Sequence, residues 1–432
     1  MTDKNSRNFF YLLLALSINV FICGRDAIAQ NNLQHYLDLA ARNNPSLKEN
    51  TNLVRISEID KSLIERQFVY PQVSLTSNYL FSPYFNNNGK LLTTNPDPNA
   101  IGYDIGITNG GLYSALVNVE KNIFNGGVVD TYQKQSDLKI KSSENANALL
   151  THTLNKDVTE QYLNTFKSQK LAAIEKALYD TIKTQLSLTE ALVKKGLAKQ
   201  SDFLLLKIEV DNERLAFEQA RSEFKKNLLE LNSLCGISDT NSIPLESVDL
   251  SYGNLKSNSN FLKQFTLDSL SIDNQQKIFE TKYAPQVNLF FNTGLNAVEL
   301  EGIQKKFGLS AGINFSLPLY DGSQKDLTQQ QTEISLKSIN GYKQNQVVTL
   351  LNKTAQAREE IDLYKNNMKN ITGQINSYEE LLRLARAEFA QGQRTMTDYI
   401  ILIRNYLEMK RNLVETQNSL QQAINQYNYW NW

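Results

Sequence analysis

Few residues of this 432-residue chain could carry acid–base, nucleophilic or metal chemistry. Its histidines are His35 and His152, and its cysteines are Cys23 and Cys235. Imidazole and thiolate groups act in catalysis or bind metals when suitable partners lie beside them. Neither histidine is near a cysteine or an acidic cluster in the sequence. With no visible set of nucleophile, base and orienting group, we expect no enzyme, no cofactor and no metal site.

A repeated motif is the better candidate for a functional site. A glycine, a hydroxyl residue, an aspartate and an aromatic residue recur 196 residues apart, as Gly196, Ser201, Asp202 and Phe203, then Gly392, Thr397, Asp398 and Tyr399. Glycine ends a helix well because it adopts the left-handed conformation that helix C-termini favour. Ser or Thr caps the next helix, and Asp stabilises its first turn. Each motif therefore predicts a tight turn between two antiparallel helices. Ser201 in the first motif and Thr397 in the second are expected to start the helix that follows the turn.

The segments around these turns predict unusually long helices. No proline occurs between residues 99 and 243 or after 318, and residues 128–195 contain neither glycine nor proline. Because proline costs about 3 kcal/mol inside a helix, such gaps permit helices of roughly 100 Å. Seven-residue spacing favours a coiled coil over an ordinary buried helix face, which remains the alternative. The residues with this spacing are Phe217, Phe224 and Leu231, with Leu228 and Cys235 in a second row.

Alternation of apolar and polar residues predicts four β-strands, two before each long helical pair. The alternation is cleanest in 307–319 and 287–295, and less regular in 71–81 and 113–124. A period of two places the apolar side chains on one face of each strand. That face could pack inside a soluble sandwich, or it could face lipid in a membrane barrel with small polar residues inside.

The order helix, strand, strand, long helix, turn, long helix occurs twice, which indicates internal duplication. We predict a first repeat over residues 30–237, a polar connector over 238–260 and a second repeat over 261–432. The first repeat is longer because of an insertion in the loop at 86–110. An exposed loop is where added residues cost least.

Residues 1–29 have the layout of a secretory signal peptide. Lys4 and Arg7 precede an apolar run at 9–23, and AIA offers a cleavage site after Ala29. A transmembrane anchor is the other interpretation, but this run is shorter than the roughly 20 residues that span a bilayer. Lipidation of Cys23 is a rival to cleavage, although Ile22 is bulky where such signals have a small residue. The equal numbers of acidic and basic residues, 45 each, suggest no nucleic-acid partner.

Several short motifs, in the same order in both halves, resemble the TolC-like outer-membrane efflux proteins. They are YLDLAARNNPSLKEN, then YPQVSLTSNY and APQVNLFFNTG where strands begin, and IFNGG (123–127) and LPLYDGS (317–323) where strands end. The resemblance implies an α+β fold with a long antiparallel α-helical coiled-coil barrel. It also implies that each chain contributes four β-strands to a trimeric 12-stranded transmembrane β-barrel. The expected location is the outer membrane of a Gram-negative cell, with the helical part in the periplasm.

The resemblance further implies the outer-membrane exit duct of a tripartite efflux or type I secretion system. Such a duct is a passive homotrimeric channel that docks a periplasmic adaptor (membrane fusion) protein and an inner-membrane pump of the RND or ABC type. The alternative is a structural or adhesive coiled-coil surface protein. That alternative accounts for the export signal and the seven-residue spacing, but not for the paired strands or the repeated turn.

Position by position, the resemblance places the two turns at a periplasmic tip that closes the duct. Asp202 and Arg394 match residues that hold the tip shut, and Phe389 stands where the family often has tyrosine. Asp398 matches an acidic residue at the narrowest point, where three carboxylates would favour cations. First-turn helix stabilisation is the alternative role for both aspartates. Ile401 replaces a second aspartate of the best-known pattern, so we expect weaker cation block. The residues expected at the turns and the adaptor contact are Gly196, Leu197, Lys199, Ser201, Gly392, Gln393 and Thr397.

Overall fold

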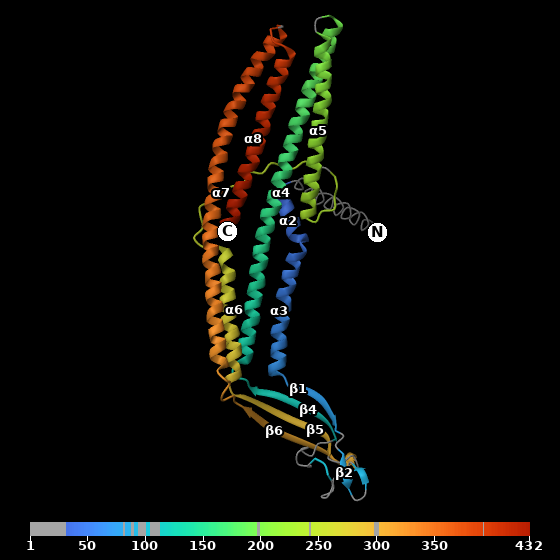
Figure 1. Ribbon diagram of the computed structural model, residues 1–432, viewed down its shortest axis with the longest axis vertical. Helices are drawn as coiled ribbons and strands as arrows, with labels where there is room; N and C mark the ends of the chain where they lie inside the picture. Colours follow the sequence, from blue (N-terminus) through green and yellow to red (C-terminus); the bar gives the residue numbers. More distant parts are fainter. Residues whose placement is uncertain are drawn as a thin grey trace, which may run out of the picture. The chain divides into compact units, whose positions relative to one another are not determined.

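The structure, a computed structural model, describes residues 32–80, 83–87, 90–93, 101–103, 113–196, 199–241, 243–297, 302–391 and 393–432 (Figure 1). The predicted signal peptide, with Cys23 and Ala29, lies outside these residues. Among the helices of the described residues, none is both long and apolar enough to cross a membrane. The main elements, in chain order, are α2 (Leu33–Asn43), α3 (Pro45–Val69), β1 (Gln72–Tyr79), β2 (Tyr84–Asn87), β3 (Lys90–Thr93), β4 (Tyr113–Phe124), α4 (Val128–Lys194), α5 (Gln200–Leu234), α6 (Lys263–Glu280), β5 (Gln286–Ala297), β6 (Phe307–Ser316), α7 (Gln324–Ala390) and α8 (Met396–Trp430).

The long helices form two pairs of matching length. α4 and α7 contain 67 residues each, and α5 and α8 contain 35 each. Each helix of the second pair starts 196 residues after its counterpart, at Gln324 against Val128 and at Met396 against Gln200. This is the offset of the turn motifs. The internal duplication predicted from the sequence therefore extends to the boundaries of the helices.

The chain forms two compact units, which we describe separately. Unit 1 contains residues up to 49, 147–262 and 344–432, and unit 2 contains residues 50–146 and 263–343. Unit 1 holds α2, most of α4, all of α5 and α8, and the second part of α7. Unit 2 holds most of α3, α6, the strands and the first parts of α4 and α7.

Unit 2 contains a four-stranded antiparallel sheet in the order β1-β4-β5-β6 (Figure 1). The register places Leu75 opposite Val117, Val117 opposite Thr293, and Thr293 opposite Leu309. The apolar positions that the alternation predicted and that lie within the strands are therefore on one face of the sheet, while Leu317 and Leu319 follow the end of β6. The other face carries mainly small polar residues and glycines, together with Leu116, Glu120 and Phe290. One of its polar residues is Asn118, whose amide donates to Thr76 Oγ1 at 2.8 Å. The predicted strands and their one-sided character are confirmed.

The loop at 86–110 contains more structure than we predicted. β2 and β3 pair as an antiparallel hairpin, and an isolated bridge joins Phe85 to Ile101. The Asn-Gly sequence at 88–89, between these strands, is a strong hairpin signal, because both residues tolerate the positive φ angles that tight turns require. The polar, insertion-like character of the segment concealed this signal.

The seven-residue spacing in α5 marks its contact with α4 and α2 in unit 1. Phe224, Leu228, Leu231 and Cys235 belong to a hydrophobic cluster that also contains Tyr36 and Val158. Phe217 stacks on Tyr179 of α4, with ring centroids 6.4 Å apart. The residues singled out by their spacing are thus the ones that join the helices.

We expect the Cys235 thiol to be inert in the native protein. Burial raises the pKa of this thiol to about 12, so only about one molecule in ten thousand carries the reactive thiolate at pH 8. A thiol reagent should modify Cys235 only after the protein is unfolded. S222C, on an exposed position of α5, should react in the native protein and serves as the control. Rapid modification of native Cys235 would contradict its burial, and one thiol per unfolded chain is expected if Cys23 has been removed.

His152 lies in an aromatic cluster with the end of the chain. Its ring stacks on Tyr429 at 5.0 Å and on Trp432 at 4.3 Å, and its Nε2 donates to the Tyr429 carbonyl oxygen at 2.9 Å. Burial lowers the pKa of His152, and the charge of Lys256 lowers it further, although the hydrogen bond to the carbonyl acts in the opposite direction. The net result is a pKa below the usual value.

This lowered pKa predicts a loss of stability in mild acid. The unfolded chain binds the His152 proton more tightly than the folded chain does, so stability falls as the pH decreases below about 6.5, the unfolded value. Above that pH the full contribution of neutral His152 to the stability of the folded chain is present. The urea midpoint should therefore drop between pH 7.5 and 5.5 by more in the native sequence than in H152F, which keeps an aromatic ring but cannot titrate. Equal drops in both proteins would show that His152 does not contribute.

Candidate functional site

The first of the two turns follows the end of α4 at Lys194. Gly196 has a φ of 69°, and its N–H donates to the Val193 carbonyl oxygen at 2.9 Å. A Cβ atom at this position would meet nothing within 4 Å. The glycine is therefore required by the left-handed backbone and not by a close neighbour. Its role as a helix stop is confirmed, while Leu197 lies outside the described residues.

The second turn follows the end of α7 at Ala390. Gln393 N–H donates to the Glu388 carbonyl oxygen at 2.9 Å, which closes the end of this helix. Gly392, the counterpart of Gly196, lies outside the described residues. The two turns therefore connect helices in the predicted way, and the conformation of the second glycine stays a prediction.

The predicted caps were wrong by two positions in both turns. The residue before α5 is Lys199, whose side chain makes no capping hydrogen bond, and Ser201 lies inside the first turn. In the second turn Thr395 caps α8, because its Oγ1 accepts from the Asp398 N–H at 3.1 Å. Thr397 likewise lies inside the helix. Thr395 has an acidic residue three positions later, which makes it the better cap.

The two aspartates lie in equivalent first turns but differ in their contacts. The Asp398 carboxylate is exposed and accepts from Thr395 Oγ1 at 2.7 Å, which completes a reciprocal capping arrangement. Asp202 is half-buried at the start of α5. The single chain thus shows the helix-stabilising role of Asp398, and its role at a pore constriction stays a prediction that depends on further copies of the chain.

Arg394 and Phe389 make their contacts inside the second helical pair. Arg394 Nε donates to Glu388 Oε2 at 2.8 Å, and its Nη2 lies 2.7 Å from the same oxygen. Phe389 stacks on Tyr399 with centroids 5.5 Å apart and ring planes 10° apart. Arg394 is therefore positioned by Glu388, a partner that the sequence analysis did not propose.

Both turns line one cleft of about 680 Å³ in unit 1. Among the predicted residues, those that line it are Gly196, Lys199, Asp202, Phe389, Gln393, Arg394 and Thr397. The structure thus brings most of the predicted site together, while Ser201 and Asp398 lie outside this lining. In the described part of the chain no group of three or more His, Cys, Asp or Glu residues could hold a metal ion.

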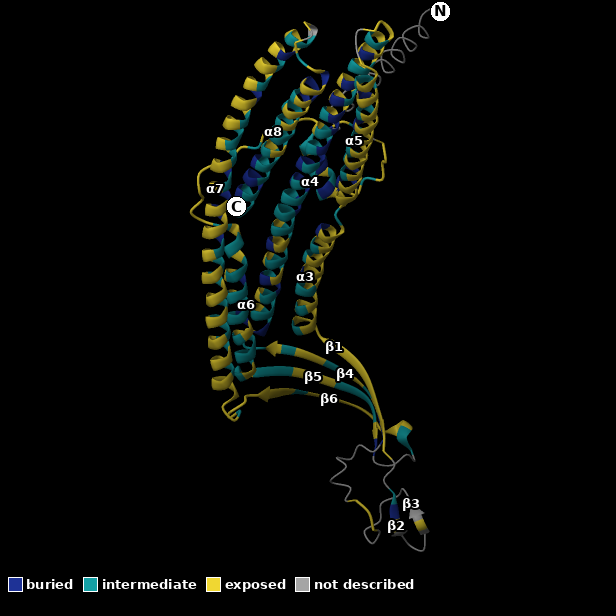
Figure 2. Cartoon of the chain, turned by 45° about the horizontal axis from the view of Figure 1, so that its top comes forward, coloured by how far each residue is buried: buried dark blue, intermediate teal, exposed yellow. Residues whose placement is uncertain are grey.

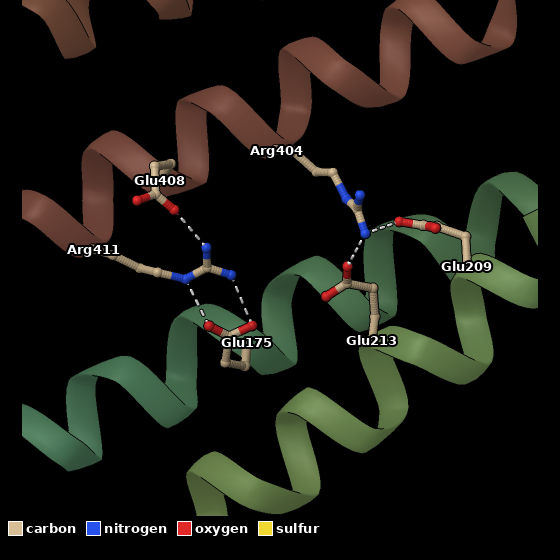
Figure 3. Close-up of polar contacts among 6 residues, drawn as sticks. All are labelled: Glu175, Glu209, Glu213, Arg404, Glu408 and Arg411. Atoms are coloured by element: carbon tan, nitrogen blue, oxygen red, sulfur yellow. Dashed lines mark hydrogen bonds and ion pairs between the residues drawn. The ribbon is translucent and has the colours of Figure 1, made fainter.

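Two arginines of α8 were missed by the sequence analysis (Figure 3). Arg411 Nε and Nη2 donate to the two carboxylate oxygens of Glu175 on α4, at 2.6 and 2.9 Å. Arg404 Nη2 donates to Glu213 Oε1 on α5 at 2.8 Å and also contacts Glu209. Their seven-residue spacing, which puts both on one helix face, was the available signal.

Comparisons with known proteins agree with this geometry. Residues 252–427 match the family model for outer membrane efflux proteins. The fold resembles the Campylobacter jejuni CmeC outer membrane channel (TM-score 0.70, 14% identity, covering 92% of this chain and 85% of that one). It also resembles the Vibrio cholerae outer membrane protein VceC (0.69, 13%, 92% and 96%) and the open state of the Neisseria gonorrhoeae MtrE outer membrane channel (0.62, 14%, 92% and 88%). Comparison with curated proteins gives no significant match.

The fold and the duplicated helical pairs are therefore those of the TolC-like outer-membrane channels. Residues 252–427 match the model of the outer membrane efflux protein family, and over the described chain the likeness to the solved channels is one of fold. The resemblance inferred from the sequence motifs is confirmed, and the family is one of channels.

Proposed function

We propose that this chain is the outer-membrane exit duct of a tripartite efflux or type I secretion system. Three copies form a passive channel in the outer membrane of a Gram-negative cell. The channel docks a periplasmic adaptor at the two turns and receives its cargo from an inner-membrane pump of the RND or ABC type. The observation that carries the proposal is the exposed apolar face of the sheet in unit 2.

Side chains on that face are exposed within the described part of the chain: Leu75 on β1 is 74% exposed, Leu309 on β6 is 75% exposed, and Val117 and Phe291 on the central strands are also exposed. In Figure 2, β1 and β6 are drawn largely in the colour of exposed residues. Side chains of this kind are stable at such exposure when lipid covers them. The opposite face, with its asparagine, serine and glycine residues, suits contact with water.

The sheet also has two edges, β1 and β6, without partners among the described strands. Unpaired backbone groups are too costly in lipid, so a membrane sheet must close on itself. Three copies, each giving four strands, would pair every β6 with the next β1 and form a closed twelve-stranded barrel. The open edges thus support the homotrimer.

Helices of unit 2 support the same assembly. Ile59 and Leu63 on α3 are exposed, as are Leu327 and Ile334 on α7. These residues recur at helical spacing and form apolar stripes on two different helices. We infer that the stripe on α7 of one copy covers the stripe on α3 of the next.

A crosslinking experiment tests the docking of an adaptor. A photoreactive residue would replace Lys199 or, in a second strain, Gln393, both of which are exposed beside the cleft. We expect a periplasmic adaptor to be captured, and the pump that co-purifies with it would identify the transport system. Capture of only cell-surface proteins, or of other copies of this chain, would overturn the docking and favour the adhesive coiled-coil protein.

A conductance measurement tests the channel itself. Purified full-length protein should form discrete ion-conducting steps in a planar lipid bilayer. A folded trimer that never conducts, over the whole voltage range that the bilayer tolerates, would argue against a duct.

A further inference from the structure

The polar connector borders a cavity in unit 1, which we call the connector cavity. Two glutamines attach the connector to the helices beside it. Gln169 on α4 makes two hydrogen bonds with the backbone of Leu245: its Oε1 accepts from the N–H at 2.7 Å, and its Nε2 donates to the carbonyl oxygen at 3.1 Å. Gln421 Oε1 on α8 accepts from the Leu250 N–H at 2.7 Å. The residues between these attachments, 247–249, form one side of the cavity.

The other sides of the connector cavity are largely apolar. Its volume is about 480 Å³, within the range of pockets that hold small molecules. Apolar side chains of three helices line it: Leu163 and Phe166 of α4, Met368 of α7 and Leu420 of α8. Because these side chains come from different helices, an apolar molecule in the cavity would lose contact with water on several sides.

Two lysines of α4 also line the connector cavity. Lys167 is half-buried and Lys170 is exposed, and neither pairs with a carboxylate among the described residues. Lys170 Nζ lies 5.1 Å from the centroid of the Phe166 ring, so its charge is held beside apolar surface. Among the described residues of the lining, Asp249 is the one carboxylate, and it accepts from Gln421 Nε2 at 2.8 Å. The charges of the cavity therefore favour an anion.

The lining also contains a hydrogen-bond acceptor without a donor. Asn418 Oδ1 on α8 is buried and has no hydrogen-bond partner among the described residues, while its Nδ2 donates to Asn164 Oδ1 at 3.4 Å. Because a buried acceptor without a donor is unfavourable, a bound molecule that offers an O–H group would gain affinity here. Asn164 precedes Lys167 by three residues, so the two are neighbours on one face of α4. The Asn418 amide thus contacts α4 one turn from a cavity lysine.

We propose that the connector cavity binds a 3-hydroxy fatty acid. The carboxylate pairs with Lys167 and Lys170, the hydroxyl donates to Asn418 Oδ1, and the acyl chain lies against Leu163 and Met368. A hydroxyl on the third carbon is close to the carboxylate, which suits an acceptor one helical turn from a lysine. This inference goes beyond the proposed channel function and does not depend on it, because it assigns no role to the turns or to the sheet.

Site-resolved photolabelling tests the proposed site. The full-length protein in lipid nanodiscs would be irradiated with dodecanoate that carries a diazirine near its methyl end, and mass spectrometry would identify the labelled peptides. We expect label in peptides that contain Leu163, Met368 or Leu420. Unlabelled 3-hydroxydodecanoate should displace it at about one fifth of the concentration that unlabelled dodecanoate requires, because of the added hydrogen bond. Dodecanol, which lacks the anion, should be at least tenfold less effective than dodecanoate.

Charge variants of α4 test the recognition of the anion. K167Q/K170Q removes both charges and should reduce labelling of the cavity about tenfold. K176Q/K183Q is the matched control, because these two lysines are also exposed on α4 but do not line the cavity. Lys183 Nζ even lies over an aromatic ring of its own helix, at 5.4 Å from the Tyr179 centroid. The control should be labelled like the native protein.

N418L tests the hydroxyl separately, because leucine has nearly the same size as asparagine but no acceptor. This variant should bind dodecanoate like the native protein and lose the fivefold preference for 3-hydroxydodecanoate. An unchanged preference would overturn the role of the Asn418 acceptor. Label confined to peptides of the sheet, equal labelling of K167Q/K170Q and the native protein, or equal displacement by dodecanol would overturn the anion site. None of these outcomes involves conductance, so failure of this site leaves the proposed channel function standing.

Discussion

Replacement of Gly294 by valine should prevent β4 and β5 from pairing and abolish assembly of the sheet. Gly294 has a φ of 148°, a conformation that side chains disfavour. A Cβ atom here would lie 2.1 Å from the Ala115 carbonyl oxygen and 3.0 Å from Leu116 Cα, both backbone atoms of the neighbouring strand. The backbone conformation alone costs a side chain about 1–3 kcal/mol, and the overlap with backbone atoms adds to it, so folded protein in the outer membrane should fall roughly tenfold or more.

The control for this substitution is the glycine opposite Gly294 on the adjacent strand. Gly308 on β6 is the register partner of Gly294, and a Cβ atom there would meet nothing within 4 Å. G308V should therefore accumulate as folded protein at nearly the native level, measured by gel mobility before and after heating. Normal assembly of G294V would show that β4 and β5 do not pair in the register described.

Glu175→Ala should cause the largest loss of stability within unit 1. It leaves the guanidinium group of Arg411, which is largely withdrawn from water, without its two-pronged partner. Removal of one side of a buried ion pair costs about 3–5 kcal/mol, and the remaining contact with Glu408 should reduce this to about 2–3 kcal/mol. The urea midpoint of the purified protein, followed by circular dichroism, measures the loss.

Glu380→Ala provides the comparison. It also removes a carboxylate from an arginine, but this pair is fully exposed and lies on a single helix. Its midpoint should match that of the native protein, because water replaces exposed partners readily. A midpoint of E175A equal to that of E380A would mean that the Arg411–Glu175 pair does not hold α8 against α4.

Local patterns in the sequence predicted the elements well. The absence of proline indicated both 67-residue helices, supported in α4 by the absence of glycine, and period-two alternation located β1, β4, β5 and β6 to within a few residues. These signals depend on neighbours along the chain, which the sequence shows directly. Gly196 was predicted for the same reason, because a helix end imposes its own backbone conformation.

The remaining features depend on contacts between distant segments. Arg404 and Arg411 meet glutamates about 190 and 236 residues away, and only the rotation of each helix about its axis determines that these faces meet. The cap positions failed for a more local reason. Several hydroxyl residues lie near the start of each second helix. The two hydrogen bonds between Thr395 and Asp398 make Thr395 the N-cap of α8.

The matched lengths of the two helical pairs limit how this chain can change. Each residue inserted into a helix turns the following face by about 100° and advances it by 1.5 Å. An insertion in α4 alone would rotate Glu175 away from Arg411, or it would shift the turn after α4 along the helix axis relative to the turn after α7. Growth of the helical region is therefore tolerated only as coordinated additions, close to whole heptads, in all four helices. The duplication thus fixes two helix lengths, each in two places, and a designed shortening must keep both pairs matched.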